Sequence, residues 1–184
     1  LIDRNGEVVV ASPEMPPVAG ILQSFIEDTP KGERAISDIY LGSGGKPTMS
    51  FAVPVFAIQG DESAASQIGV VVGVKEISAE LYPLLKQPGN TDATSEALLV
   101  RRSGATIEYI SPLSDGTAAL KRKLSVDTPD LAAMFAINTP GGFGTFRDYL
   151  DQEVLVTSRA ISTAPWSLLY KINTSEALVE SERR

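Results

Sequence analysis

The sequence of 184 residues contains no cysteine, no histidine and a single tryptophan. Without thiols or imidazoles, the chain cannot build the cysteine- and histidine-based sites that hold zinc. It also lacks the side chain that enzymes use most often as a general base. The absence of cysteine fits both an oxidising and a reducing compartment. We therefore assign no catalytic residue, no metal ligand and no cofactor from the sequence.

The chain also lacks an excess of positive charge and a long hydrophobic run. Its 16 Lys and Arg against 23 Asp and Glu give a net charge of −7, with no basic cluster, so a nucleic-acid partner is not expected. No apolar segment is long enough to span a bilayer. The sequence does not begin with Met, and Leu1 opens in a strand-like pattern. We expect any targeting or membrane segments of the parent protein to lie outside this piece.

The sequence is organised around the stretch from Ala65 to Leu85. Within it, Ile68 to Val74 is a run of Val, Ile and Gly, which predicts a buried strand. Ser78 can cap a following helix, whose first turn carries Glu80. We expect this stretch to complete a first small sheet domain.

The residues before this stretch predict a hairpin, a helix and two strands. The hairpin turns at Asn5-Gly6, and apolar residues at helical spacing from Val18 to Phe25 predict an amphipathic helix. The expected strands are Ile36 to Leu41 and Thr48 to Ala57. In the second of them, Pro54 predicts an edge position or a bulge.

The pattern restarts after a polar linker, which we place at residues 89–96. The turn glycines Gly6 and Gly104 are separated by the same interval as Ile68 and Trp166, which open the last strand of each half. Because the strands come in hairpins, the predicted class is α+β: two tandem subdomains, each an antiparallel sheet of about five strands with flanking helices.

The second half also carries two helix-start signals. Thr128-Pro129-Asp130 offers a cap, a proline and an acid for the first turn of a helix. After the last strand, Asn173 and Glu176 form a possible capping box. Trp166 is expected to pack in the core, as large aromatic side chains usually do.

Several segments, in the order in which they follow one another along the chain, resemble the double Cache family, which comprises the tandem PAS-like sensor domains of bacterial transmembrane receptors. In the first half they are Leu-Ile-Asp-Arg-Asn-Gly-Glu-Val-Val, Ile-Ser-Asp-Ile-Tyr-Leu, Phe-Ala-Val-Pro-Val-Phe and Ile-Gly-Val-Val-Val-Gly-Val. In the second half they are Ala-Leu-Leu-Val-Arg-Arg-Ser-Gly, Phe-Arg-Asp-Tyr with Val-Leu-Val-Thr-Ser-Arg-Ala-Ile, and Ala-Pro-Trp-Ser-Leu-Leu-Tyr-Lys-Ile-Asn-Thr-Ser-Glu-Ala-Leu. The last string is the most specific, and the resemblance covers nearly the whole chain.

The resemblance implies a periplasmic signal-input domain of a receptor of the histidine kinase or diguanylate cyclase type, without enzymatic activity of its own. Residues 1–88 would be the membrane-distal subdomain, without the family's long N-terminal helix. Residues 97–173 would be the membrane-proximal subdomain, and 174–184 an exit helix toward a transmembrane segment. The resemblance also implies a homodimeric receptor that binds a small molecule in the distal half. The family's amino-acid-binding pattern is not matched, because Lys75 stands near the position of its Asp.

Four residues of the first half are candidate ligand contacts. Asp38 and Tyr40 would share one face of a strand, where Asp38 could hold an amine and Tyr40 could supply a ring and a hydroxyl. The alternative is that this face is solvated and that Ile39 and Leu41 belong to the core. Lys75 could pair with a ligand carboxylate, or lie exposed at the end of its strand. Arg34 is the fourth candidate.

Two other functions stay open at this point. A hydrolase would need a nucleophile or a carboxylate pair, but the sequence has no Gly-x-Ser-x-Gly elbow and no identifiable pair. A domain that senses a partner protein or a mechanical state would need no ligand cavity. In that case the distal pocket would be filled by the domain's own side chains.

Overall fold

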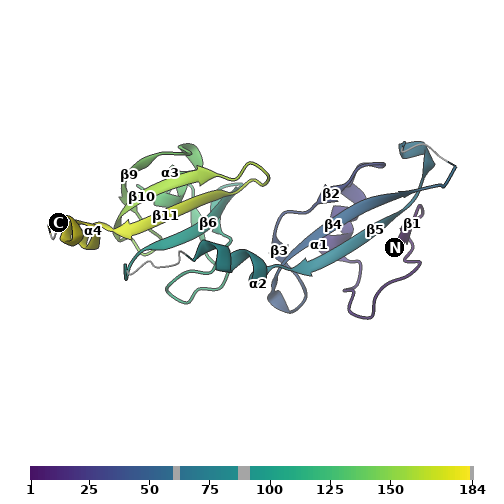
Figure 1. The fold of residues 1–184 in the computed structure, drawn as a ribbon, viewed down its shortest axis with the longest axis horizontal. Coiled ribbons are helices and arrows are strands. Elements are labelled where there is room, and N and C mark those ends of the chain that lie inside the picture. The colour runs from purple at the N-terminus through teal and green to yellow at the C-terminus, as the bar shows by residue number, and fades with distance from the viewer. Residues whose placement is uncertain (60–62, 87–91, 183–184) are drawn as a thin grey trace. The chain divides into compact units, whose positions relative to one another are not determined.

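A computed structural model describes residues 1–59, 63–86 and 92–182. The chain divides into two compact units, Leu1–Ser78 and Ala79–Arg184. Each unit is built on one antiparallel sheet (Figure 1), so the predicted α+β class is confirmed. The linker predicted at 89–96 lies partly outside the described residues. Its described remainder leads into the first strand of the second unit.

In its described residues, the first unit contains the α-helix α1, two 3-10 turns, η1 (Ser43–Gly45) and η2 (Ala64–Ser66), and a five-stranded sheet. Its elements are β1 (Ile2–Asp3), α1 (Gly20–Asp28), β2 (Ala35–Ile36), β3 (Tyr40–Leu41), β4 (Pro47–Phe56) and β5 (Gln67–Glu76). The strands run in the order β1-β5-β4-β2, and β3 pairs with another part of β4. The predicted turn at Asn5-Gly6 is present, because the Asp3 carboxylate accepts the N–H groups of Asn5 at 2.8 Å and Glu7 at 2.9 Å.

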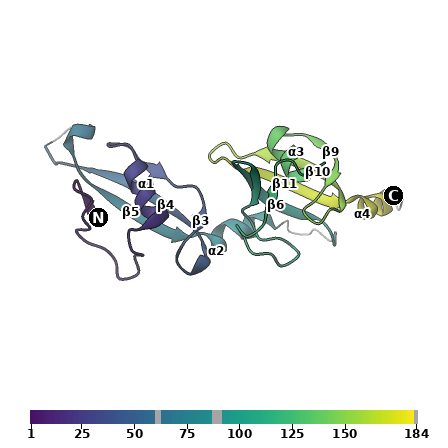
Figure 2. The same cartoon turned by 180° about the vertical axis from the view of Figure 1, so that it is seen from behind.

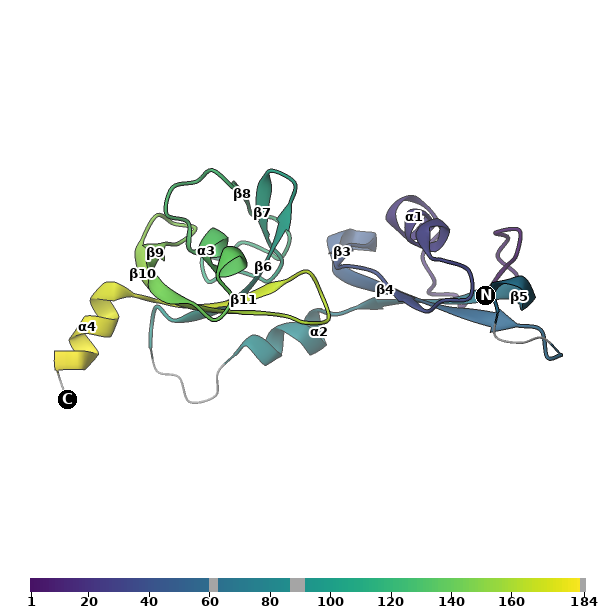
Figure 3. The same ribbon diagram turned by 90° about the horizontal axis from the view of Figure 1, so that it is seen from above.

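The two faces of this sheet differ in what covers them. Helix α1 lies over one face (Figures 2 and 3), which we call the inner face; there Thr48, Ser50 and Ala52 of β4 are buried. On the opposite, outer face, the cross-strand partners Val53 and Val71 are 43% and 47% exposed. The run from Ile68 to Val74 was predicted as buried, but Val71 and Gly73 are exposed while Val70, Val72 and Val74 are partly buried, because α1 covers only one side of the strand.

The strand predicted from Ile36 to Leu41 is wrong as a continuous element. It is interrupted between β2 and β3, where side chains take backbone N–H groups that a strand ladder would use. The Asp38 carboxylate accepts the N–H of Ile39 at 2.7 Å, and the Ser37 hydroxyl accepts the N–H of Ser50 at 2.8 Å. Pro54 follows Ala52, the last residue of β4 that pairs with β2, so its predicted edge position is confirmed.

The second unit repeats the plan of the first with additional strands. Its elements are α2 (Ser78–Leu81), a 3-10 turn η3 (Tyr82–Leu85), β6 (Glu96–Ser103), β7 (Thr106–Tyr109), β8 (Lys123–Ser125), α3 (Ala132–Asn138), β9 (Phe143–Arg147), β10 (Glu153–Ala160), β11 (Ser167–Asn173) and α4 (Thr174–Glu182). The sheet order is β8-β7-β6-β11-β10-β9. The part β6-β11-β10-β9 corresponds to β1-β5-β4-β2 of the first unit, which explains the internal repeat in the sequence.

Of the two helix-start predictions in this unit, the first is wrong in position, and the second is right in position but not in its capping box. Helix α3 begins at Ala132, because Asp130 has a φ of +51° and its carbonyl accepts the N–H of Arg147 at 2.8 Å. The capping box is not formed, since the Glu176 carboxylate accepts the N–H groups of Ala93 at 2.7 Å and Thr94 at 2.8 Å. In both places a contact with a distant segment outweighs the local signal.

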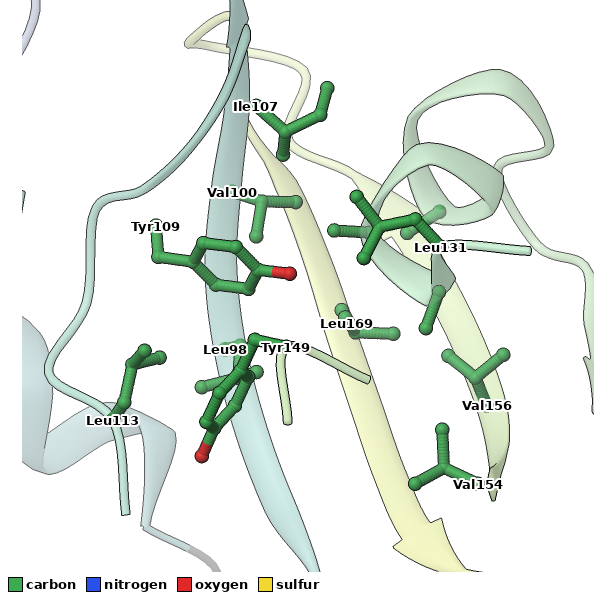
Figure 4. Close-up of a cluster of buried hydrophobic side chains, with 13 residues drawn as sticks. Leu98, Val100, Ile107, Tyr109, Leu113, Leu131, Tyr149, Val154, Val156 and Leu169 are labelled. Carbon is green, nitrogen blue, oxygen red and sulfur yellow. The ribbon is translucent and has the colours of Figure 1, made fainter. Parts of the chain in front are cut away.

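The hydrophobic core of the second unit fills the space between α3 and the face of the sheet beneath it (Figure 4), which we call the inner face of this unit. Among its buried side chains are Leu98, Ile107, Tyr109, Leu131, Tyr149, Val156 and Leu169. Trp166 is buried as predicted, with 8% of its surface exposed. Among the described helices, none combines the length and the hydrophobicity that a membrane crossing requires.

Candidate ligand-binding site

A cavity of about 550 Å³ lies in the first unit between α1 and the inner face of the sheet. Its volume falls within the range of small-molecule sites, about 300–1,000 Å³. The floor comes from β3, β4 and β5, and the walls come from Glu14, Pro16 and Pro17, from the start of α1 and from the loop that follows β3. Its polar lining residues are Glu14, Tyr40, Ser43, Lys46, Thr48 and Glu76.

The floor of this cavity is set by the pairing of β4 with β5. Thr48 is opposite Glu76 and Ser50 is opposite Val74 in the strand register, so these side chains share the inner face. Of the small side chains on this face, Thr48 lines the cavity, whereas Ser50 and Ala52 are fully buried and are not among its lining residues. Gly42 closes one wall, because a Cβ atom there would collide with the Thr48 side chain.

Hydrogen bonds orient the polar groups of the cavity. The hydroxyl groups of Tyr40 and Ser50 are 2.7 Å apart, which fixes the Tyr40 ring at the cavity floor. The Thr48 hydroxyl donates to the carbonyl of Lys46 at 2.8 Å. At the rim, Lys46 Nζ lies 2.9 Å from Glu76 Oε2, and their side chains are 63% and 45% exposed.

The ion pair at the rim can exchange partners at little cost. Exposed pairs of this kind contribute only about 0–1 kcal/mol to stability. A bound charged group can therefore replace one partner without a large loss. The lining holds two acids, Glu14 and Glu76, against one base, Lys46, so its formal charge is negative. Among the described residues, no group of acidic side chains has the arrangement of a metal site.

The structure brings one of the four predicted contacts to this cavity. Tyr40 lines it, whereas Asp38, Lys75 and Arg34 are not among its lining residues. Lys75 lies between Val74 and Glu76 in β5, so strand alternation directs its side chain to the outer face. Asp38 is exposed and caps Ile39, and Arg34 is exposed just before β2. As ligand contacts, these three residues stay predictions.

Five polar residues of the cavity were not predicted from the sequence: Glu14, Ser43, Lys46, Thr48 and Glu76. Lys46 and Glu76 are distant in sequence and meet only through the β4–β5 register. One signal was available for Thr48, because β4 alternates small polar residues with large apolar ones. A face made of small residues either packs closely against a helix or leaves a cavity, and the sequence alone does not decide between them.

The corresponding space in the second unit contains a packed core. There the inner face is covered by α3, and aromatic side chains fill the space beside it. The Tyr109 and Tyr149 rings meet edge to face with centroids 5.6 Å apart (Figure 4). The two units thus share a topology but differ at the inner face, where the first unit has a cavity and the second a core.

No protein-family model and no curated protein matches this sequence. Comparison of the fold finds the periplasmic sensory domain of the Campylobacter jejuni chemoreceptor Tlp1, with a TM-score of 0.54 and 14% identity over 87% of this chain. The ligand binding domain of Mlp24 with asparagine has a TM-score of 0.53 and 16% identity over 93%. The extracellular domain of rpHK1S-Z16, which is assigned as a histidine kinase, has a TM-score of 0.58 and 12% identity over 96%.

These similarities establish the fold. The chain spans 56%, 63% and 70% of the three structures, respectively. It has the tandem PAS-like fold of the extracytoplasmic sensory domains of chemoreceptors and histidine kinases, as the resemblance in the sequence implies.

Proposed function

We propose that this chain is the extracytoplasmic signal-input domain of a transmembrane receptor, and that it binds a small polar molecule in the cavity beneath α1. The cavity carries the proposal, because it has the volume and the convergent polar groups of a small-molecule site. A structural neighbour, the domain of Mlp24, was solved with asparagine, which supports binding of small metabolites by this fold.

In the proposed mechanism, the ligand changes the balance between two arrangements of the domain. A ligand shifts such a balance only if its affinity differs between the two arrangements. The cavity offers this difference, because its walls come from α1 and from loops while its floor is a sheet. The signal would leave through α4, which follows the last strand directly and would continue toward a membrane segment of a homodimeric receptor.

A domain that senses only a partner protein or a mechanical state is favoured less. That hypothesis predicts a distal inner face filled by the domain's own side chains. The first unit instead has a cavity there, whereas the second unit has the filled arrangement.

A thermal-shift screen tests the proposal. The 184-residue chain is heated with amino acids, amines, carboxylates, purines and sugars. A ligand present at 100 times its dissociation constant stabilises the folded state by about 2.7 kcal/mol, which raises the melting temperature by several degrees. Uniform absence of a shift, followed by absence of binding in calorimetry, would contradict small-molecule sensing.

Two neighbouring residues of β5 provide a matched pair of variants for any compound found. Glu76 lines the cavity. Lys75 lies between the lining residues Val74 and Glu76 in the strand, and its side chain is on the opposite face of the sheet. We expect Glu76→Gln to change the dissociation constant and Lys75→Gln to leave it unchanged. The reverse result would move the site to the outer face and would support Lys75 as a contact.

A further inference from the structure

A second cavity of about 730 Å³ lies in the first unit beside the hairpin that precedes α1, and its lining includes both Val71, on the outer face of β5, and Val72, on the inner face. Its walls include Leu1, Ile2, Val10, Met15 and Val72, and Ser12 is the one polar side chain among the described residues that line it. The volume again suits a small molecule, but the chemistry differs from that of the first cavity. We call the first the polar cavity and the second the apolar cavity.

The two cavities are neighbours that share part of their walls. Pro16 and Pro17 belong to the walls of both. Their floors are adjacent on one strand, because Val72 lines the apolar cavity and Val74 lines the polar cavity. These residues share one face of β5 and are about 7 Å apart along the strand. The distance is short enough for one small molecule to reach both cavities.

The apolar cavity is lined by hydrophobic side chains that are partly exposed in this 184-residue chain. Val8 and Val10, which both line it, are 53% and 60% exposed. Transfer of these surfaces out of water is favourable, so a ligand that covers them gains affinity. A purely polar metabolite would occupy only the neighbouring cavity.

We infer that the ligand of this domain is amphipathic, with a polar head in the polar cavity and an apolar chain or ring in the apolar cavity. This inference rests on the proposed function, since it specifies the ligand of the same distal site. The polar cavity holds two acidic side chains and one basic one, so a cationic head is favoured over an anionic head. Straight-chain alkylamines are therefore suitable probes.

Calorimetry of the 184-residue chain with alkylamines of increasing length tests this inference. While each added methylene enters the apolar cavity, the dissociation constant should fall about fourfold per methylene. Alkylcarboxylates of the same lengths should bind more weakly. Dissociation constants that do not change with chain length would overturn the inference.

Two adjacent valines provide matched variants. Val10 and Val9 are 60% and 61% exposed, but only Val10 lines the apolar cavity. We expect Val10→Glu to abolish the dependence on chain length while the shortest amine binds as before, and Val9→Glu to retain it. If Val10→Glu does not fold, Met15→Gln places a polar group in the same wall.

The possible failures can be distinguished. If a polar metabolite from the screen binds but alkylamines show no dependence on length, the amphipathic ligand is wrong and the sensor proposal stands. If no compound binds in either experiment, both are wrong. If Val10→Glu changes only the oligomeric state in sedimentation, the hairpin surface is a contact between copies of the chain, and the inference is overturned.

Discussion

Glu176, in the first turn of α4, accepts hydrogen bonds from both the hydroxyl and the backbone N–H of Thr94. The Thr94 hydroxyl in turn accepts the N–H of Asn173, the last residue of β11, at 3.1 Å. Ala93 and Thr94, which precede β6, are therefore hydrogen-bonded to the junction between β11 and α4, where the chain leaves the sheet of the second unit. Under the proposed mechanism, a displacement of this segment would act on the start of α4 through these hydrogen bonds.

We expect Glu176→Ala to loosen α4. The substitution removes the acceptor for the N–H groups of Ala93 and Thr94 and an acid from the first turn of the helix, where negative charge is stabilising. Hydrogen exchange of the α4 amides should become several-fold faster, while the amides of β10 and β11 keep their protection. Ser175→Ala, at an exposed neighbouring position, is the control and should leave exchange unchanged. Equal exchange in both variants would show that the contact does not hold the helix.

The stability of the second unit should fall in acid. Burial raises the pKa of Glu108, but hydrogen bonds from Lys123 and Arg101 outweigh burial and hold this pKa below its ordinary value of 4.5. The Thr94 hydroxyl and the N–H groups of Ala93 and Thr94 likewise lower the pKa of Glu176.

Because both pKa values are lower in the folded state, their stabilisation is fully present above about pH 4.5, and it is lost as the pH falls through the folded values. Urea unfolding followed by circular dichroism should show a lower midpoint at about pH 3 than at about pH 7. Glu108→Gln should reduce this pH dependence. A variant with an unchanged pH dependence would exclude Glu108 as a source.

We expect Lys171→Met to destabilise the second unit strongly. Lys171 is 4% exposed, and its Nζ lies 2.7 Å from Asp148 and 3.3 Å from Glu96. Removal of one partner leaves buried carboxylates without their cation, which typically costs about 3–5 kcal/mol. The free energy of unfolding from urea titrations measures this loss. Lys121→Met, at an exposed position, should stay within about 0.5 kcal/mol of the original chain.

Much of the fold could be predicted from the sequence because its signals are local and repeated. The turn at Asn5-Gly6 and the helical spacing from Val18 predict elements that the structure contains. The hairpin order in both halves predicts two antiparallel sheets, and these are present. Errors occur where a side chain bonds the backbone, as at Asp38, or where a distant segment takes a capping group, as at Glu176.

The candidate site was less predictable, because its position depends on which face of a strand is covered. Lys75 and Glu76 are adjacent in the sequence, and only the side of the sheet on which α1 lies makes Glu76 a lining residue. Strand alternation separates the two residues but does not say which of them faces the helix. Tyr40, which was chosen because its ring and hydroxyl suit a ligand site, lines the cavity, whereas Asp38 was paired with it on the assumption of a continuous strand.

Two glycines of β5 should respond differently to alanine. A Cβ atom at Gly69 would lie 2.6 Å from the carbonyl oxygen of Ile2, which is backbone of the paired strand β1. Gly69→Ala must therefore displace β1, at a cost of about 1–3 kcal/mol. At Gly73 nothing lies within 4 Å of the added carbon, so Gly73→Ala should be neutral or stabilise by up to about 1 kcal/mol, because alanine loses less chain entropy. Urea unfolding of the two variants measures the difference.

The two glycine variants, Gly69→Ala and Gly73→Ala, also test whether β1 supports the apolar cavity. Ile2 lines that cavity and is paired with Val70 of β5. If Gly69→Ala displaces β1, it should also weaken binding of the longer alkylamines while the shortest amine binds as before. Gly73→Ala should change neither, because it alters no contact of the cavity wall. Equal stability and equal binding in both variants would mean that β1 is not held at the distance from β5 that the structure shows.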